Sequence, residues 1–141
     1  MAAKEFSIEN SNGLFQRYSK NPILTQKDLP YPAHSVFNAG ATKYGDQVLL
    51  LLRVEDMTGF SHLTVAKSGD GYNNWQIDPR PTFTADPDNY PEELYGIEDP
   101  RVVHVPELKK YIITYTAYSD NGPCVSLAQT EDFKTFERNG V

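Results

Sequence analysis

Cysteine is almost absent from this sequence: its 141 residues include only Cys124, so no disulfide can form within the chain. A single cysteine is typical of proteins from reducing compartments. Residues 1–6 lack the apolar segment of a secretory signal peptide. No run of 18 apolar residues occurs, so no membrane-spanning helix is predicted. We therefore expect a cytoplasmic protein that does not enter a membrane.

Positive charge is also scarce. The chain has 13 Lys and Arg residues against 19 Asp and Glu residues, and its net charge is -6. Nucleic-acid binding needs clustered basic residues that neutralise phosphates, and the pair Lys109-Lys110 fits a turn better than such a cluster. No His, Cys and Asp residues occur at metal-ligand spacing. We expect no nucleic-acid partner, no metal and no cofactor.

Helical periodicity of useful length is missing, whereas aromatic residues are plentiful: nine Tyr, seven Phe and one Trp. Tyr and Phe favour strands, and they also suit sites where flat rings stack on sugar faces. Short apolar or β-branched segments separated by turn residues predict an all-β chain. The predicted strands cover residues 35–42, 48–54, 62–68, 74–77, 101–105, 111–118 and 125–130, with a last short strand after 136.

Two of these strands stand out by composition. Residues 48–54 form the most apolar run, and because the run is short and ends in turn signals, we expect a strand buried on both faces. Residues 35–42 are mostly small, which would let this strand crowd against others near a central axis. The proline-rich segment 78–95 predicts a long loop, and such loops are often functional.

The strand pattern repeats once along the chain. Residues 65–68 match 127–130 at an offset of 62 (127 − 65), and the following turns 68–71 and 130–133 also match. Asn38 and Asp99 fall at corresponding points, at an offset of 61 (99 − 38). A repeat of four antiparallel strands is typical of β-propeller blades.

The repeat divides the chain into an N-terminal lead-in, two blades and a loop between them. We expect the lead-in at 1–20, the first blade at 34–77, the proline-rich loop at 78–95 and the second blade at 96–141. Two blades leave strand edges unpaired, so the sequence predicts a partial propeller that lacks later blades.

The candidate site centres on residues 95–101, where Glu98, Asp99, Pro100 and Arg101 precede an apolar strand. An isolated motif of this kind also fits a simpler structure, in which Asp99 caps a turn and Arg101 pairs with Glu98. The corresponding position of Asn38 in the other blade favours a site instead, because the innermost strands of a propeller converge on one funnel. Arg53 and Asp56 end the most apolar strand and are further candidates.

The motifs together resemble a known family. Residues 21–24 (NPIL), 36–41 (VFNAGA), 52–56 (LRVED), 61–68 (SHLTVAKS) and 96–101 (GIEDPR) are similar to glycoside hydrolase family 130, the β-mannoside phosphorylases and related β-mannosidases. The resemblance covers nearly all of the chain from residue 21 onward. It implies a five-bladed β-propeller, of which this chain would form about the first two blades.

The resemblance also implies a role for individual residues. Asp99 matches the family's proton donor, which acts through the mannose 3-hydroxyl. Asn38 and Arg53 match positions that hold the mannosyl unit, and Asp56 with His62 match supporting positions. Further candidates are Glu98 and Arg101 for substrate and Asn121, in the loop 119–122, for phosphate.

The remaining histidines carry less weight than these residues. His62 and His104 lie in predicted strands, where a histidine is usually packed and hydrogen-bonded, and His34 lies in a loop that could reach substrate. Most phosphate-binding residues of the family lie in later blades.

One acid without a paired base fits phosphorolysis, because phosphate is already an anionic nucleophile. The expected reaction converts a β-mannosyl-oligosaccharide and phosphate into α-mannose 1-phosphate and a shortened acceptor. Two alternatives stay open: a β-mannosidase that uses water, and a carbohydrate-binding propeller without catalysis. The linkage and the acceptor sugar also stay open, and a homo-oligomer is possible.

Overall fold

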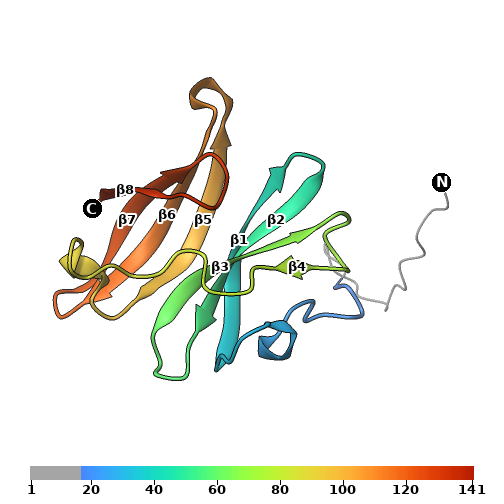
Figure 1. Ribbon diagram of the computed structural model, residues 1–141, viewed down its shortest axis with the longest axis horizontal. Coiled ribbons are helices and arrows are strands. Elements are labelled where there is room, and N and C mark those ends of the chain that lie inside the picture. The colour runs from blue at the N-terminus through green and yellow to red at the C-terminus, as the bar shows by residue number, and fades with distance from the viewer. Residues whose placement is uncertain (1–16) are drawn as a thin grey trace.

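The computed structural model describes residues 17–141, so most of the lead-in predicted for 1–20 lies outside the described residues. The described chain is all-β, with two four-stranded antiparallel sheets side by side (Figure 1). In each sheet every strand pairs with the next one along the chain, which is the meander of a propeller blade. The predicted all-β, partial-propeller fold is confirmed.

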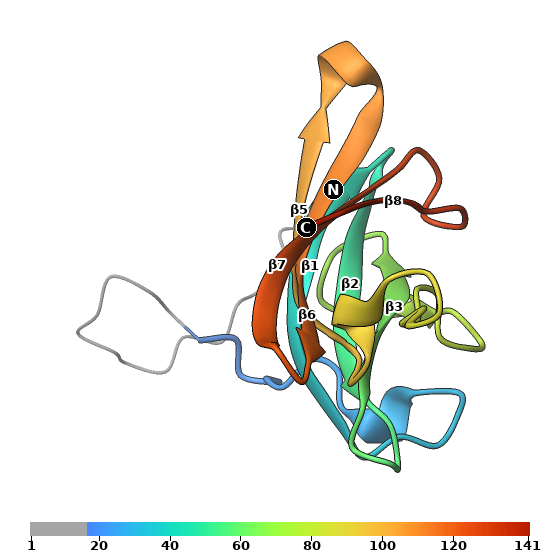
Figure 2. The same cartoon turned by 90° about the vertical axis from the view of Figure 1, so that its left-hand side faces the viewer.

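The first blade contains four strands and the second blade four more. The first holds β1 (Ser35–Tyr44), β2 (Gln47–Glu55), β3 (Ser61–Ser68) and β4 (Gln76–Ile77). The second holds β5 (Ile97–Val105), β6 (Lys110–Ser119), β7 (Gly122–Thr130) and β8 (Glu137–Gly140). Three single-turn 3-10 helices occur at Gln26–Asp28, Pro91–Glu93 and Pro106–Leu108. In Figure 2 the long strands of both blades run along the same direction.

The main core lies between the two blades. Alternate residues of a strand face opposite sides of the sheet, so β2 and β3 each present every second residue to the second blade. The buried side chains of this core are Leu49, Leu51, Leu63, Val65, Phe83, Ile97, Tyr111, Ile113, Tyr115, Ala117, Ala128 and Phe133.

The other face of β2 is buried as well. Leu52 and Val54 join Ala66 in a second cluster, against which Leu24, Leu29 and other residues of the segment before β1 pack. The strand predicted to be buried on both faces is therefore confirmed, and its second face is covered by the chain's own N-terminal segment.

The innermost strands β1 and β5 approach closely because Gly40 has no side chain. A Cβ atom at Gly40 would lie 2.8 Å from Val102 Cγ2 and 3.1 Å from the Pro100 carbonyl oxygen. The first of these distances is essentially never seen for real Cβ atoms, and the second is shorter than most Cβ contacts. The small residues of this strand thus permit the crowding that the sequence predicts.

The repeated turns after β3 and β7 have the same hydrogen bonds. Ser68 Oγ donates to the Asn73 carbonyl oxygen at 2.6 Å, and Thr130 Oγ1 donates to that of Thr135 at 2.6 Å. In both turns an aspartate two residues on, Asp70 or Asp132, accepts from two backbone N–H groups. The predicted match between these turns is confirmed.

Three predicted strand limits are wrong. β5 begins at Ile97 rather than at residue 101, because a β-bulge accommodates Asp99-Pro100 within the strand. Within residues 17–141, β5 pairs with β6 alone, so the missing N–H of Pro100 leaves no strand of this sheet unpaired. β7 likewise begins at Gly122 and includes Pro123. β4 begins at Gln76 rather than at residue 74, since Asn74 has a positive φ of 54° and is not extended.

Within residues 17–141, none of the helices has the length and apolar character needed to cross a bilayer.

A buried ion pair joins the loop 78–95 to the last strand of the second blade. Glu93 is 0% exposed, and its two carboxylate oxygens accept from Arg138 Nε at 3.0 Å and Nη2 at 3.1 Å. Tyr115 Oη donates to Glu93 at 2.6 Å, and the Asp86 N–H donates at 2.8 Å. Burial, together with the hydrogen bond to Glu93, raises the pKa of Tyr115. These bonds fix the path of the loop that leads into β5.

Replacement of Glu93 should therefore lower the stability of the fold. We expect Glu93→Ala to lower the free energy of unfolding by about 3–5 kcal/mol, since Arg138, whose side chain is only 13% exposed, would lose its partner. The exposed pair Lys110–Glu137, at 3.4 Å, provides the control: Glu137→Ala should cost less than about 1 kcal/mol. Urea unfolding of both variants measures the difference, and equal losses would contradict the account.

The turn after β7 predicts a pH dependence of stability. Backbone N–H groups of Thr135 and then Lys134 lower the pKa of Asp132 from 3.8 to about 2. A carboxyl group whose pKa is lower in the folded than in the unfolded state stabilises the fold at any pH above its unfolded-state pKa. This stabilisation disappears as the pH falls through the folded-state pKa. Asp132→Asn should therefore lower the urea midpoint by its full amount at pH 7. The difference between the variant and the parent protein should shrink as the pH falls from 3.8 to about 2. A loss independent of pH would show that the charge of Asp132 is unimportant.

Candidate active site

Arg53 connects the two blades at the end where β1 and β5 begin. Its Nη1 donates to Asp99 Oδ1 at 2.8 Å and its Nη2 lies 2.9 Å from Glu98 Oε1. Its Nε donates to Ser61 Oγ at 3.1 Å. The planar guanidinium therefore serves three acceptors at fixed angles, which a lysine could not do.

Asn38 and Arg101 complete this group from the two innermost strands. In the amide orientation that its neighbours favour, Asn38 Nδ2 donates to Asp99 Oδ1 at 2.8 Å. Asn38 Oδ1 then accepts from Arg101 Nη1 at 3.2 Å. We call Asn38, Arg53, Glu98, Asp99 and Arg101 the acid–arginine cluster. The fold brings these five predicted residues together, and the simpler pairing of Arg101 with Glu98 is wrong, because Glu98 pairs with Arg53.

Matching β-bulges place Asn38 and Asp99 on the two inner strands. The register between β1 and β2 shifts between Val36 and Ala39, and that between β5 and β6 shifts between Glu98 and Arg101. Asn38 is the second bulged residue of its strand, whereas Asp99 is the first. The predicted equivalence is therefore wrong by one position, although the bulges still direct both side chains to the same place.

The backbone at Asp99 is strained. Its φ is 48°, in the left-handed region that few residues other than glycine adopt, although aspartate tolerates it better than most. Strain of this kind costs on the order of 1–3 kcal/mol and is concentrated at functional sites.

Asp99 is the most open acid of the cluster. Its side chain is 44% exposed, against 27% for Glu98 and 18% for Arg53. The hydrogen bonds from Arg53 and Asn38 both end on Oδ1. Among residues 17–141, Oδ2 has no such partner, so this oxygen is open to contact with a ligand.

Two residues of the site were missed from the sequence. The Phe37 ring lies under the Arg53 guanidinium, with 4.7 Å between Cζ and the ring centroid, and this cation–π contact helps to orient the arginine. Ser61 accepts from Arg53 Nε. Phe37 could have been proposed from the sequence, because it directly precedes the site residue Asn38. The contact between Ser61 and Arg53 depends on the register of β2 and β3 and could not.

Asp56 and His62 lie outside the cluster. Asp56 Oδ1 closes the β2–β3 turn by accepting from the Thr58 N–H at 2.7 Å and the Phe60 N–H at 3.1 Å. Burial alone would raise the pKa of Asp56, but the hydrogen bonds from Thr58 and Phe60 lower it overall.

His62 points to the opposite face of β3 from Ser61, where its Nε2 lies 3.1 Å from Tyr31 Oη. Burial lowers the pKa of His62, and the charge of Asp56 partly opposes this effect. Asp56, His62 and Ser61 line a neighbouring pocket of about 450 Å³ beneath the loop 78–95. The two predicted residues therefore adjoin the acid–arginine cluster without touching it.

The other predicted residues are more distant. Asn121 lies in the β6–β7 turn at the same end of the molecule, and its N–H donates to Ser119 Oγ at 3.4 Å. His34 Nδ1 lies 2.7 Å from Glu55 Oε1. His104 packs on Tyr111, with ring centroids 4.6 Å apart, toward the opposite end of β5.

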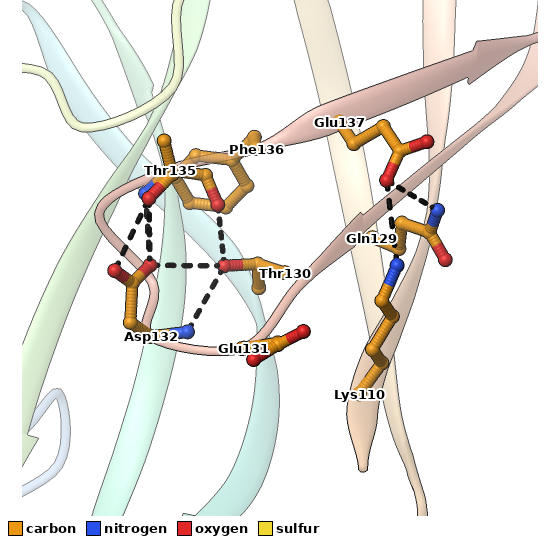
Figure 3. A pocket seen from close by; sticks show the side chains of 8 residues that line it. All are labelled: Lys110, Gln129, Thr130, Glu131, Asp132, Thr135, Phe136 and Glu137. Carbon is orange, nitrogen blue, oxygen red and sulfur yellow. Dashed lines mark hydrogen bonds and ion pairs between the residues drawn. The ribbon is translucent and has the colours of Figure 1, made fainter. Parts of the chain in front are cut away.

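A separate pocket of about 280 Å³ lies at that opposite end (Figure 3). Its polar side chains bind one another: Glu137 accepts from Gln129 at 2.7 Å and pairs with Lys110, while Asp132 accepts from its own turn. The pocket contains no predicted site residue, and most of its polar side chains form structural contacts with one another.

The strain at Asp99 can be measured directly. We expect Asp99→Gly to be more stable than Asp99→Ala by about 1–2 kcal/mol, because alanine is disfavoured at positive φ. In ordinary strand positions alanine is the more stable of the two. Thermal and urea unfolding of both variants provide the comparison, and greater stability of the alanine variant would show that no such strain exists.

Comparison with known proteins gives a consistent result. The model of glycoside hydrolase family 130, described as beta-1,4-mannooligosaccharide phosphorylase, matches residues 10–141. A β-1,2-mannobiose phosphorylase of Listeria innocua is 26% identical, over 88% of this chain and 50% of its own length. A 4-O-β-D-mannosyl-D-glucose phosphorylase of Bacteroides fragilis is 26% identical, over 96% of this chain and 41% of its own length.

A solved structure is similar as well. It is described in connection with glycoside hydrolases, within the GH130 family of mannoside phosphorylases, that target β-1,2 mannosidic linkages in Candida mannan. It is 25% identical with a TM-score of 0.76, over 86% of this chain and 39% of its own. The chain thus spans half or less of the length of the relatives that it matches.

Proposed function

This chain belongs to glycoside hydrolase family 130, and we propose that the full-length protein cleaves β-mannosides by inverting phosphorolysis. The substrates would be a β-mannosyl-oligosaccharide and inorganic phosphate, and the products α-mannose 1-phosphate and a shortened acceptor. The observation that carries the proposal is the open Asp99 carboxyl group, held by Arg53 and Asn38 at the meeting point of two blades.

The arrangement suits a proton donor. Cleavage requires a proton for the leaving glycosidic oxygen, and a positioned carboxyl group can supply it. Asp99 would give the proton from Oδ2, through the mannose 3-hydroxyl, while Arg53 and Asn38 hold Oδ1 in place. Glu98 is less suited to this role, because its side chain is 27% exposed against 44% for Asp99, although both acids pair with Arg53.

Phosphate then needs no general base, because it arrives as an anion. In this proposal Arg53, Asn38 and Arg101 bind hydroxyl groups of the mannosyl unit, since all three present polar atoms beside Asp99. Asn121 would contribute to phosphate binding from the β6–β7 turn at the same end. The reaction would use no cofactor, and we place it in the cytoplasm.

Hydrolysis is the second candidate, because hydrolases of this family are described for the similar solved structure. An inverting hydrolase needs a base that activates water about 6.5–9.5 Å from the acid. Such an enzyme would release free mannose instead of mannose 1-phosphate.

Replacement of the acid tests the proposed role of Asp99. In the full-length protein, Asp99→Asn should lower kcat for phosphorolysis of β-mannobiose by about 10²–10⁴-fold, since the amide cannot donate the required proton. Asp46→Asn, in the exposed β1–β2 turn at the other end of the blade, is the matched control and should retain full activity. Turnover of Asp99→Asn close to that of the control would exclude Asp99 as the acid.

A further inference from the structure

Three aromatic rings from three separate segments form a partly exposed row. Phe60 ends the β2–β3 turn, Tyr95 precedes β5 and Tyr118 lies near the end of β6. The Phe60 and Tyr95 ring centroids are 5.9 Å apart, and those of Tyr95 and Tyr118 are 5.8 Å apart. Phe60 is 46% exposed and Tyr118 is 43% exposed. We call these three residues the aromatic row.

The row adjoins the acid–arginine cluster through one backbone contact. Ser61 and Gly96, the residues next to Phe60 and Tyr95, form an isolated parallel β-bridge. A Cβ atom at Gly96 would lie 2.7 Å from the Ser61 carbonyl oxygen, and its φ is +105°, so the bridge requires glycine. Ser61 also accepts from Arg53. Phe60 is thus the sequence neighbour of the serine that accepts from Arg53, and Tyr95 lies three positions before Glu98 (98 − 95).

A carboxylate accompanies the rings. Tyr95 Oη donates to Asp120 Oδ1 at 2.5 Å, which fixes the central ring to the tip of the β6–β7 turn. This hydrogen bond, reinforced by the charge of Asp120, raises the pKa of Tyr95, so its hydroxyl keeps the proton that it donates. Asp120 Oδ2 has no hydrogen-bond partner within residues 17–141 and can accept from a ligand hydroxyl.

None of the three rings belongs to the buried core that the two blades share, and Phe60 and Tyr118 are nearly half exposed within residues 17–141. Exposed aromatic faces carry partial negative charge, and the C–H groups of a sugar ring carry partial positive charge on an apolar face. Rings beside an open carboxylate therefore offer both the apolar and the polar contacts that a pyranose needs.

We propose that the aromatic row binds the acceptor end of the oligosaccharide, meaning the sugar units beyond the bond that is cleaved. This inference rests on the proposed function, which places the mannosyl unit against Arg53, Asn38 and Asp99. The remaining sugars must then leave the cluster along its side, and the row borders the cluster through Ser61 and Gly96. Phe60 and Tyr118 would stack on sugar faces, while Asp120 accepts from a hydroxyl.

Two ligands distinguish binding at the acceptor end from binding at the mannosyl position. β-Mannotriose reaches beyond the cleaved bond, whereas α-mannose 1-phosphate does not. With full-length protein that also carries Asp99→Asn to prevent turnover, Phe60→Ala and Tyr118→Ala should each weaken β-mannotriose binding about five- to tenfold. Their affinity for α-mannose 1-phosphate should stay within about twofold. Isothermal titration calorimetry, with both β-1,2- and β-1,4-linked trioses, measures these constants.

Two further variants exclude a merely structural effect. Tyr118→Phe keeps the ring and should retain triose affinity, and Tyr72→Ala removes an exposed aromatic ring beyond the other end of β3, so it should change neither affinity. In the active enzyme, Tyr118→Ala should raise KM for β-mannotriose and leave kcat unchanged.

The outcomes are distinct. Unchanged triose affinity in both alanine variants, equal losses for both ligands, or no triose binding by the parent protein would overturn the acceptor assignment. Triose binding that needs the row in a protein without phosphorolytic activity would support the assignment and refute the proposed function.

Discussion

The interaction on which this structure depends is the division of one guanidinium group between two blades. Arg53 comes from β2 of the first blade, and both acids that it binds come from β5 of the second blade. The contact works only because Gly40 lets β1 and β5 approach closely and because two bulges turn Asn38 and Asp99 toward each other. The Arg53 side chain therefore depends on the close approach of the strands and is also part of the candidate active site.

The surrounding structure keeps this end of the molecule in place. Glu93 and Arg138 fix the loop that leads into β5, and the Ser61–Gly96 bridge joins that loop to the β2–β3 turn. Asp99 itself is held at a positive φ before a proline. Backbone strain of this kind is concentrated at functional sites, which is the basis for the role proposed for Asp99.

Much of this could be predicted from the sequence, because apolar periodicity and matching turns define strands and blades without knowledge of distant contacts. The prediction failed where tertiary structure decides: Pro100 suggested a strand boundary, but a bulge carries it inside β5. His62, which matches a supporting position of the family, lies on the opposite face of β3 from Ser61 and lines the pocket beside the cluster, and only the strand register reveals this placement. The Glu93–Arg138 pair joins residues 45 apart, so no local pattern could reveal it.

The central claim is that Asp99 protonates a glycosidic oxygen while phosphate, not water, attacks the sugar. The most direct measurement is phosphorus NMR of full-length protein incubated with β-mannobiose and inorganic phosphate, together with sugar analysis. The account predicts that α-mannose 1-phosphate accumulates as phosphate is consumed, with one equivalent of mannose released as acceptor. Two equivalents of free mannose with unchanged phosphate would show a hydrolase and contradict it.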